Sequence, residues 1–204
     1  MEFMNTDGDN RSNSYRHIMK EILIIDVEST CWDKTISATQ EMDGQISEII
    51  EIGMSLFKYY ENTIEKIPSI FIKPQFSTVS QFCENLTGIT QDKLDSVGIP
   101  FPQAIETIEL LGLEKYPWAS WGDYDRKIFR NNCQLHNVPY PWNDQHTNIK
   151  QCFSDLYLFG KKRCGMKEAL NLLKMPLIGQ HHSGGDDAYN IARIWQKMVK
   201  DHAE

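Results

Sequence analysis

The sequence lacks several patterns that would assign it to a secreted or membrane class. No apolar run approaches the ~20 residues of a membrane-spanning helix, and no signal peptide with a charged and then an apolar region opens the chain. The five cysteines are scattered without a C-x-x-C pair, which argues against a zinc site or a disulfide framework and predicts reduced thiols. We therefore expect an intracellular, cytoplasmic protein that does not enter a membrane.

Motifs of several well-known enzyme classes are missing as well. The chain has no G-x-x-x-x-G-K-[ST] loop and no G-x-S-x-G nucleophile elbow, and no cysteine lies in a recognisable catalytic signature. Positive charge is also scarce, since 21 lysines and arginines face 28 acidic residues for a formal net charge of -7. That balance argues against a protein that coats DNA non-specifically. It does not exclude a nucleic-acid enzyme whose metal-binding carboxylates contribute negative charge.

The composition that remains is that of one globular domain. The chain has 204 residues, of which 41% are hydrophobic and 24% charged, as is typical of a folded protein with a single core. Residues 1–20 are rich in asparagine, serine, aspartate and arginine without apolar periodicity, which predicts a disordered leader. Residues 21–204 are expected to form the one domain.

Apolar periodicity predicts a mixed sheet flanked by helices. Three closely spaced strands are expected at 21–28, 50–56 and 67–72, and they should form an antiparallel meander. Residues 31–47 are polar and irregular, which predicts a loop. The later elements alternate, with helices expected at 104–111, 124–135, 166–173 and 188–199 and strands at 118–121 and 147–149. This order indicates an α/β fold with five strands, an antiparallel meander followed by parallel strands.

The first predicted strand ends in two carboxylates on one face. Side chains alternate along a strand, so Asp26 and Glu28 point to the same side as Ile24. Adjacent carboxylates repel each other, and a cation between them would explain the arrangement. The alternative is a strand that runs out into a solvated acidic turn. Ligands from elsewhere in the chain are needed to decide between the two.

A second acidic cluster, Trp121-Gly122-Asp123-Tyr124-Asp125, falls where a strand ends and a helix begins. The carboxyl ends of sheet strands are where α/β proteins bind ligands. Each acid also has a structural explanation. Asp123 suits a helix N-cap, and Asp125 suits the dipole of the first helical turn.

A third cluster, His181-His182-Ser183-Gly184-Gly185-Asp186-Asp187, lies immediately before the last helix. The glycines permit a sharp turn, and Asp186 or Asp187 could simply cap the helix. The same turn can also hold an imidazole and a carboxylate toward one cleft.

Together the clusters offer the parts of a metal-dependent phosphoryl-transfer site. The hard oxygen ligands are Asp26, Glu28, Asp125 and Asp187. Such ligands favour two Mg²⁺ or Mn²⁺ ions over Zn²⁺. In a site of this kind one ion lowers the pKa of a water, His182 removes its proton, and the other ion stabilises the leaving 3′-oxygen. If the acids were only caps of a small-ligand-binding protein, the shared face of Asp26 and Glu28 would have no explanation.

Five sequence blocks occur in a fixed order: 25–31 (IDVESTC), 48–53 (EIIEIG), 82–91 (FCENLTGITQ), 121–125 (WGDYD) and 182–194, which ends in NIARI. Together they resemble the DEDDh 3′–5′ exonucleases of the ribonuclease H-like fold, and the resemblance spans about residues 21–199. It is closest to the RNA-trimming branch that contains histone-mRNA and enhanced-RNAi type exonucleases and small bacterial relatives.

The resemblance implies a role for each residue of the site. It makes Asp26, Glu28, Asp125 and Asp187 the metal ligands, and it makes His182 the general base, with Glu28 also counted as catalytic.

The resemblance also chooses within two ambiguous pairs. It favours Asp125 over Asp123, because the family's third acid follows an aromatic residue and opens a helix. It favours Asp187 over Asp186, because the family's fourth acid stands five residues after the histidine. His181 is then expected to be structural or exposed.

A substrate pocket is implied as well. Ser29, Leu86 and Thr87 are expected to line the site of the terminal nucleotide together with His182, with Leu86 against the base. Contact with the 2′-hydroxyl is how such a pocket could prefer RNA over DNA.

The expected function is therefore metal-dependent 3′–5′ exonuclease activity on short or single-stranded RNA 3′ ends. A DNA exonuclease of the proofreading type is the nearest alternative, and a non-catalytic nucleic-acid-binding module is another. The basic run Lys161-Lys162-Arg163, with Lys167, is the expected contact for upstream phosphates, although it could equally be a solvated loop.

Overall fold

The computed structural model describes residues 20–33, 45–143 and 145–202. The predicted leader at 1–20, apart from its last residue, lies outside these ranges, as does most of the predicted loop at 31–47. Among the described residues, no helix combines the length and the apolar character that crossing a membrane would require.

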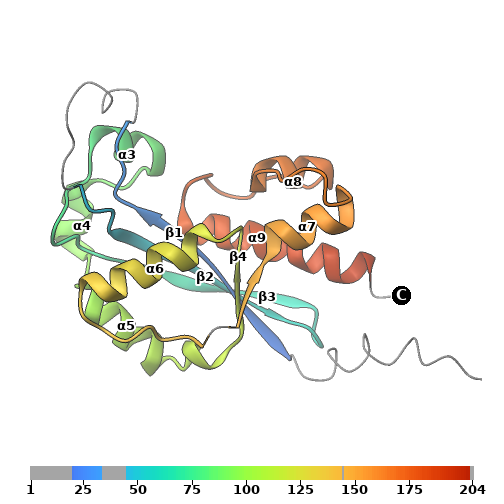
Figure 1. Ribbon diagram of the computed structural model, residues 1–204, viewed down its shortest axis with the longest axis horizontal. Helices are drawn as coiled ribbons and strands as arrows, with labels where there is room; N and C mark the ends of the chain where they lie inside the picture. The colour runs from blue at the N-terminus through green and yellow to red at the C-terminus, as the bar shows by residue number, and fades with distance from the viewer. Residues whose placement is uncertain (1–19, 34–44, 144, 203–204) are drawn as a thin grey trace, which may run out of the picture.

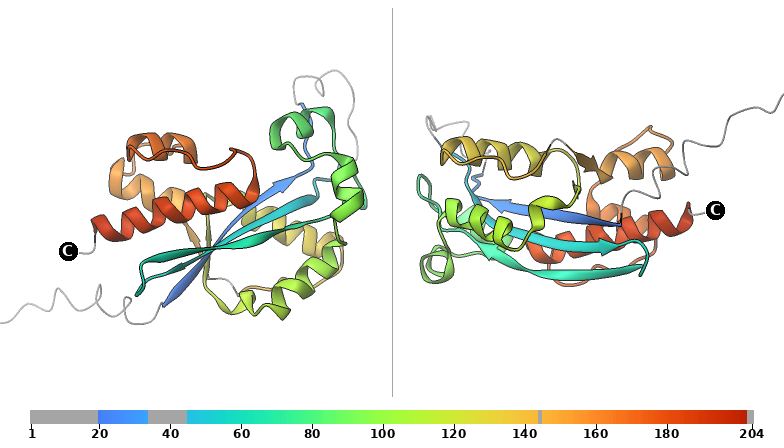
Figure 2. Two further views of the ribbon diagram at one scale, coloured as in Figure 1. Left: turned by 180° about the vertical axis from the view of Figure 1, so that it is seen from behind. Right: turned by 90° about the horizontal axis from the view of Figure 1, so that it is seen from below.

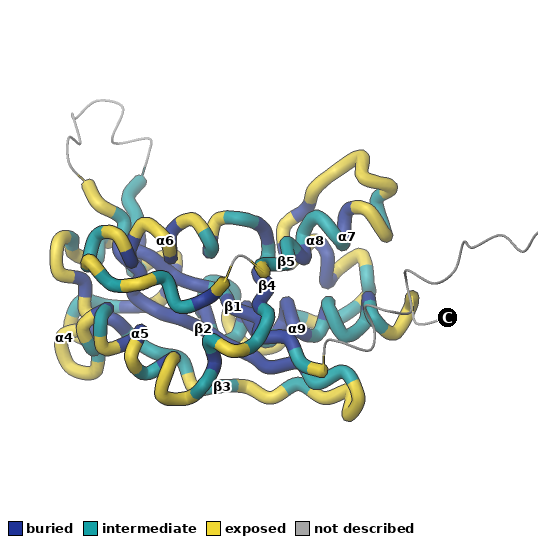
Figure 3. The backbone as a smooth tube through the Cα atoms, turned by 60° about the horizontal axis from the view of Figure 1, so that its bottom comes forward, coloured by how far each residue is buried: buried dark blue, intermediate teal, exposed yellow. Residues whose placement is uncertain are grey.

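Three strands form the antiparallel meander that the sequence predicts. β1 (Glu21–Ser29) pairs with β2 (Ile49–Lys58), which in turn pairs with β3 (Thr63–Phe71). β3 begins before residue 67, where the sequence predicts its start. The prediction missed its first residues because charged side chains there interrupt the apolar alternation. It is an edge strand, which tolerates this polarity. Figure 3 shows the contrast between the buried β1 and β2 and the more exposed β3.

Two short strands complete the sheet. β4 (Trp118–Ser120) runs parallel to β1, and β5 (His146–Asn148) runs parallel to β4. The strand order is β3-β2-β1-β4-β5, so β1 lies at the centre. The predicted mixed five-stranded sheet is confirmed, and the carboxyl ends of β1 and β4 meet at one edge, where α/β proteins bind ligands.

Helices cover both faces of the sheet (Figures 1 and 2). They are α3 (Gln81–Thr87), α4 (Gln91–Val97), α5 (Phe101–Leu110), the 3-10 helix η1 (Leu113–Lys115), α6 (Tyr124–Leu135), α7 (Ile149–Tyr157), α8 (Met166–Leu172) and α9 (Gly184–Asp201). Leu23 and Ile25 of β1 pack against α5 and α6 on one face, whereas Ile22 and Ile24 pack against α7, α8 and α9 on the other. The alternation that predicts β1 therefore also decides which helices each side chain meets.

Candidate active site

An open pocket of about 370 Å³ lies at the carboxyl ends of β1 and β4. Its lining comes from the end of β1, the β4–α6 turn, the start of α8 and the turn before α9. Segments that are distant in the sequence thus meet at one place. The lining includes the five residues predicted as ligands or base, which are Asp26, Glu28, Asp125, His182 and Asp187.

The four acids reach the pocket from three elements. Asp26 and Glu28 lie at the end of β1 on the face that α9 covers. Asp187 lies in the first turn of α9, and oxygens of these three carboxylates approach within 4.8 Å of one another. Asp125 lies in the first turn of α6, where its Oδ1 accepts a hydrogen bond of 3.2 Å from the backbone N–H of Val27. That bond fixes the start of α6 against the end of β1.

Burial and mutual repulsion disfavour the charged forms of these acids. Burial, followed by the charges of Asp187 and Glu51, raises the pKa of Glu28 to about 8. Burial and then the charges of Asp125 and Glu28 raise the pKa of Asp26 well above its usual value. Burial also raises the pKa of Asp125, to about 6, although the hydrogen bond from Val27 opposes it. Such a cluster is stabilised by bound cations.

One buried oxygen of the cluster has no hydrogen-bond partner among the described residues. It is Oδ1 of Asp187, whereas Oδ2 accepts a bond of 2.9 Å from the backbone N–H of His182 and lies 2.8 Å from Nδ1 of His181. An unpaired buried carboxylate oxygen is unfavourable unless a cation satisfies it. With Asp26 and Glu28 beside it, this donor set fits a hard divalent cation.

The histidine pair faces the same pocket. The rings of His181 and His182 are stacked, with centroids 4.0 Å apart and an interplanar angle of 19°. His182 has a φ of 64°, a left-handed conformation that a non-glycine residue seldom adopts. Burial, and then the neighbouring His181, lower the pKa of His182, which keeps its ring neutral and able to accept a proton. His181 is half-buried and bonded to Asp187, so it supports a predicted ligand.

Asp123 and Asp186, the two acids that were not chosen as ligands, bond to groups outside the pocket. Asp123 accepts hydrogen bonds of 3.0 Å from Arg126 and from Asn148, and Asp186 accepts bonds from Lys66 and from the backbone of Gln180. Neither acid lines the pocket.

A buried glutamate that the sequence pattern did not identify as functional anchors α9. Glu51 of β2 lies opposite Glu28 in the sheet register. Its carboxylate accepts hydrogen bonds from the backbone N–H groups of Gly184 (3.0 Å) and Gly185 (3.1 Å). The signal available in the sequence is an acid inside an otherwise apolar strand, and its partner becomes visible only when α9 is packed on the sheet.

The same contact requires a glycine in β2. A Cβ atom at Gly53 would lie 1.9 Å from the carbonyl carbon of Gly184 and 2.2 Å from the nitrogen of Gly185. Both are backbone atoms of α9, so no side-chain rotation can relieve the clash. Gly53 therefore allows the start of α9, with His182 and Asp187 beside it, to approach the strand.

Of the four predicted substrate residues, His182 lines the pocket, whereas Ser29, Leu86 and Thr87 lie beside it. The hydroxyl of Ser29 lies 2.8 Å from that of Tyr124, which does line the pocket. Leu86 is 37% exposed on α3. Thr87 is buried and its hydroxyl donates to the carbonyl of Cys83, so it is already occupied within its own helix.

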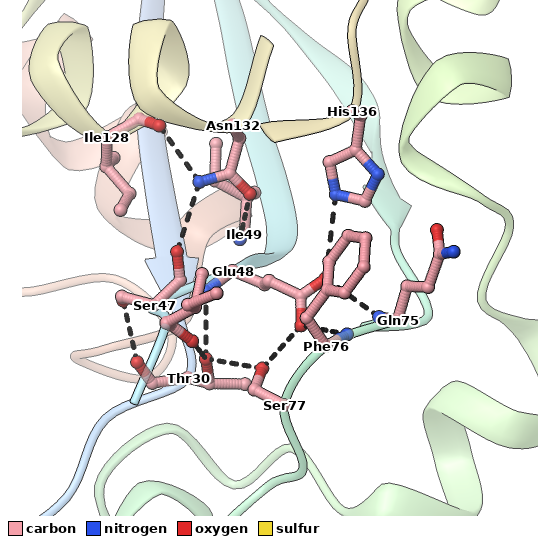
Figure 4. A network of polar contacts seen from close by, with 11 residues as sticks. Thr30, Ser47, Glu48, Ile49, Gln75, Phe76, Ser77, Ile128, Asn132 and His136 are labelled. Carbon is pink, nitrogen blue, oxygen red and sulfur yellow. Dashed lines mark hydrogen bonds and ion pairs between the residues drawn. The ribbon is translucent and has the colours of Figure 1, made fainter. Parts of the chain in front are cut away.

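A buried polar network supports the segment that follows β1 (Figure 4). Glu48 accepts hydrogen bonds from the backbone N–H groups of Gln75 (2.7 Å) and Phe76 (2.8 Å). The side chain of Asn132 in α6 joins the carbonyl of Ser47 to the N–H of Ile49. These bonds fix the approach to β2 next to the end of β1.

Comparisons with known proteins agree with this geometry. The sequence pattern of the family described as Exonuclease matches residues 23–195. The chain is 32% identical to 3′-5′ exoribonuclease 1 of Rattus norvegicus over 95% of this chain and 57% of the relative. It is 26% identical to the probable 3′-5′ exonuclease KapD of Bacillus subtilis over 88% of this chain and 85% of that protein.

One solved structure is similar to this chain over nearly the full length of both proteins. It is the nuclease domain of 3′hExo, described as a DEDDh family member bound to rAMP, with a TM-score of 0.79 and 30% identity over 91% of this chain and 94% of that one. The chain spans only a little more than half the length of the mammalian relatives it matches.

Proposed function

The chain belongs to the exonuclease family, and from this premise we propose that it removes nucleotides from the 3′ end of RNA by metal-dependent phosphodiester hydrolysis. The observation that carries the proposal is the convergence of Asp26, Glu28 and Asp187 within 4.8 Å of one another, with Asp125 and His182 in the same pocket. The RNA preference is supported by the names of relatives described as exoribonucleases. We also infer a cytoplasmic location, in keeping with five free cysteines.

Four carboxylates would hold the metal. We assign Asp26, Glu28, Asp125 and Asp187 as ligands, because they line one pocket and one oxygen of Asp187 has no other partner among the described residues. Three of them are buried, and Asp26 is half-buried. When bound, two Mg²⁺ or Mn²⁺ ions would supply charge neutralisation, polarisation of the scissile phosphate and activation of water. The remaining catalytic work falls to side chains of the protein.

His182 is assigned as the general base. Its lowered pKa keeps the imidazole neutral near pH 7, which lets a ring nitrogen take a proton from the attacking water. Its backbone N–H is bonded to Asp187, so base and ligand move as one unit. His181 stacks on the ring and limits its rotation.

We place the terminal nucleotide between the pocket and α3. Ser29 touches Tyr124 at the pocket edge, and the carbonyl of Thr87 lies 3.5 Å from the side-chain nitrogen of Gln180, the residue before the histidine pair. The exposed Leu86 then offers an apolar surface to the base. Hydroxyl and backbone groups on this side are suited to the ribose.

A degradation assay with blocked ends tests the proposal. We expect release of mononucleotides from a 5′-labelled single-stranded RNA with a free 3′-hydroxyl, only with Mg²⁺ or Mn²⁺ present. A 3′-phosphorothioate or inverted terminal nucleotide should stop the reaction, and a blocked 5′ end should not. Equal or faster turnover of a matched DNA strand would favour the proofreading alternative, and internal cleavage would overturn the exonuclease assignment.

Replacing His182 with alanine is expected to lower kcat by about 10²–10⁴-fold, the usual contribution of a general base. The affinity for Mn²⁺, measured by isothermal titration calorimetry, should stay within a few-fold of wild type, because the carboxylates remain. A loss of metal affinity as large as the loss of rate would make His182 a ligand and not a base.

A further inference from the structure

One wall of the pocket, opposite α3, combines an aromatic ring with two lysines. We call it the strand wall and define it by Trp121, Lys150, Met166 and Lys167. Three of these residues line the pocket, and Lys150 lies in the first turn of α7. Figures 1 and 2 show α3 on one side of the end of β1 and α7 with α8 on the other. We propose that the strand wall holds the nucleotides upstream of the scissile phosphate, an inference that rests on the proposed function.

The aromatic part of the wall is held in place. The indole N–H of Trp121 donates a hydrogen bond of 3.1 Å to the carbonyl of Cys164, and its ring lies against Phe153 with centroids 5.7 Å apart. The residue remains partly exposed and lines the pocket. A fixed, partly exposed indole is a stacking surface for a base of any identity, as proteins that bind single strands commonly use.

The two lysines bring positive charge to an acidic site. The Nζ of Lys150 lies 3.9 Å from the position of a Cβ on Gly122, in the turn that leads to Asp125. Lys167 itself lines the pocket that Asp125 and His182 also line. Both cations therefore lie at the edge of the pocket, on the side of α7 and α8.

Lys150 is available for a ligand, and so is Lys167, which was predicted together with the basic run 161–163 to contact phosphates. Two residues of the run itself are engaged with other side chains. Lys162 pairs with Glu168 at 2.6 Å, and Arg163 donates to Gln151 at 2.5 Å. Lys150 and Lys167 have no ion pair among the residues that the structure describes. Lysines without an acidic partner, placed beside the four acids, are what a phosphate backbone needs in order to approach a negative pocket.

The position of the wall sets the direction of the strand. The terminal nucleotide belongs on the α3 side with Leu86, and the scissile phosphate belongs at the carboxylates. The rest of the strand then leaves over α7 and α8, where Trp121 meets a base and the two lysines meet phosphates. A substrate with a single nucleotide cannot reach this wall, whereas an oligomer can.

The test compares two substrates in a Lys150→Gln, Lys167→Gln double variant. For a single-stranded RNA 12-mer, KM is expected to rise on the order of tenfold with kcat largely kept, because each lost phosphate contact weakens strand binding. For the p-nitrophenyl ester of a mononucleotide, kcat/KM should change by a much smaller factor. RNA binding measured with Ca²⁺ in place of Mg²⁺ should show a shallower salt dependence, by about 0.7 in slope per lost contact.

Lys161→Gln with Lys174→Gln is the matched control, since both lysines are exposed and neither lines the pocket. It removes the same charge and should leave both KM values near wild type. If the KM for RNA is unchanged in the Lys150 and Lys167 variant, the strand wall does not bind the upstream nucleotides. If the KM for RNA rises in the control variant, the upstream strand is assigned to the 161–163 loop instead. If the wild type hydrolyses neither substrate, it is the proposed function that fails.

Discussion

Replacing Asp26 with asparagine is expected to abolish the nuclease activity while making the metal-free protein more stable. The loss should be at least about 10³-fold, because the metal centre supplies several kcal/mol of transition-state stabilisation. The gain follows from the cluster itself, since burial and the charges of Asp125 and Glu28 disfavour the ionised form of Asp26 and a neutral amide removes that repulsion. Mononucleotide release from labelled RNA measures the first effect, and thermal unfolding with EDTA measures the second.

The stability gain should depend on pH in a defined direction. The pKa of Glu28 is raised to about 8 in the folded protein, and that of Asp26 is raised as well. Folding therefore favours the protonated acids, so their contribution to the stability of the metal-free protein is most favourable below the unfolded pKa of about 4 and is lost as pH rises toward 8. We expect a Tm gain on the order of 5 °C for Asp26→Asn near pH 8, and little gain near pH 5.

Asp123→Asn is the matched control for this variant. Asp123 lies two residues from the site acid Asp125 but is bonded to Arg126 and Asn148 outside the pocket. Its replacement should leave turnover within a few-fold of wild type and give no stability gain. If Asp26→Asn keeps turnover near wild type, or lowers the Tm of the metal-free protein, the assignment of Asp26 to a cluster of mutually repelling metal ligands is wrong.

The second large effect is expected from replacing Gly53 with alanine. A methyl group there would lie 1.9 Å from the backbone of Gly184, so α9 must move away from β2. We expect a loss of about 3 kcal/mol in the free energy of unfolding, equivalent to a Tm decrease of about 10 °C. Activity should fall below detection even where the variant is folded, because Asp187 and His182 move with α9.

Ser55→Ala is the control for this prediction. Ser55 lies two residues further along β2 on the same face, is fully buried, and its hydroxyl has no hydrogen-bond partner among the described residues. Removing that hydroxyl should keep or raise the Tm and leave RNA turnover near wild type. A Gly53→Ala variant with normal Tm and normal turnover would mean that α9 does not lie this close to the strand.

The sheet and the longest helix could be predicted because their periodicity is strong. β1 alternates between two helical layers, and α9 carries one continuous apolar stripe. The short helices α3, α4 and α7 were not predicted. α3 and α4 have seven residues each, too few to establish a helical period. Their caps, Ser80 and Thr90, were readable signals, because each accepts a hydrogen bond from the third residue after it.

Some residues of the candidate site could likewise be predicted from the sequence, whereas others could not. Residues that belong to a local pattern, such as Asp26 with Glu28, could be proposed from spacing, and the family resemblance chose Asp125 and Asp187. Glu51 could not be assigned, because its role depends on a helix that follows far along the chain. Lys150 was missed for the same reason, since only the fold brings α7 next to the β4–α6 turn.

The parts of the pocket come from opposite ends of the described chain, and this has a consequence for biosynthesis. A ribosome makes the chain from its amino terminus, so Asp26, Glu28 and Asp125 emerge well before His182 and Asp187. The nascent protein, tethered close to its own messenger RNA, then carries three acids and no base. Only after α9 has been translated and has docked against Gly53 and Glu51 is the pocket complete. The order of translation thus delays the proposed RNA cleavage until the template has been read through the last helix.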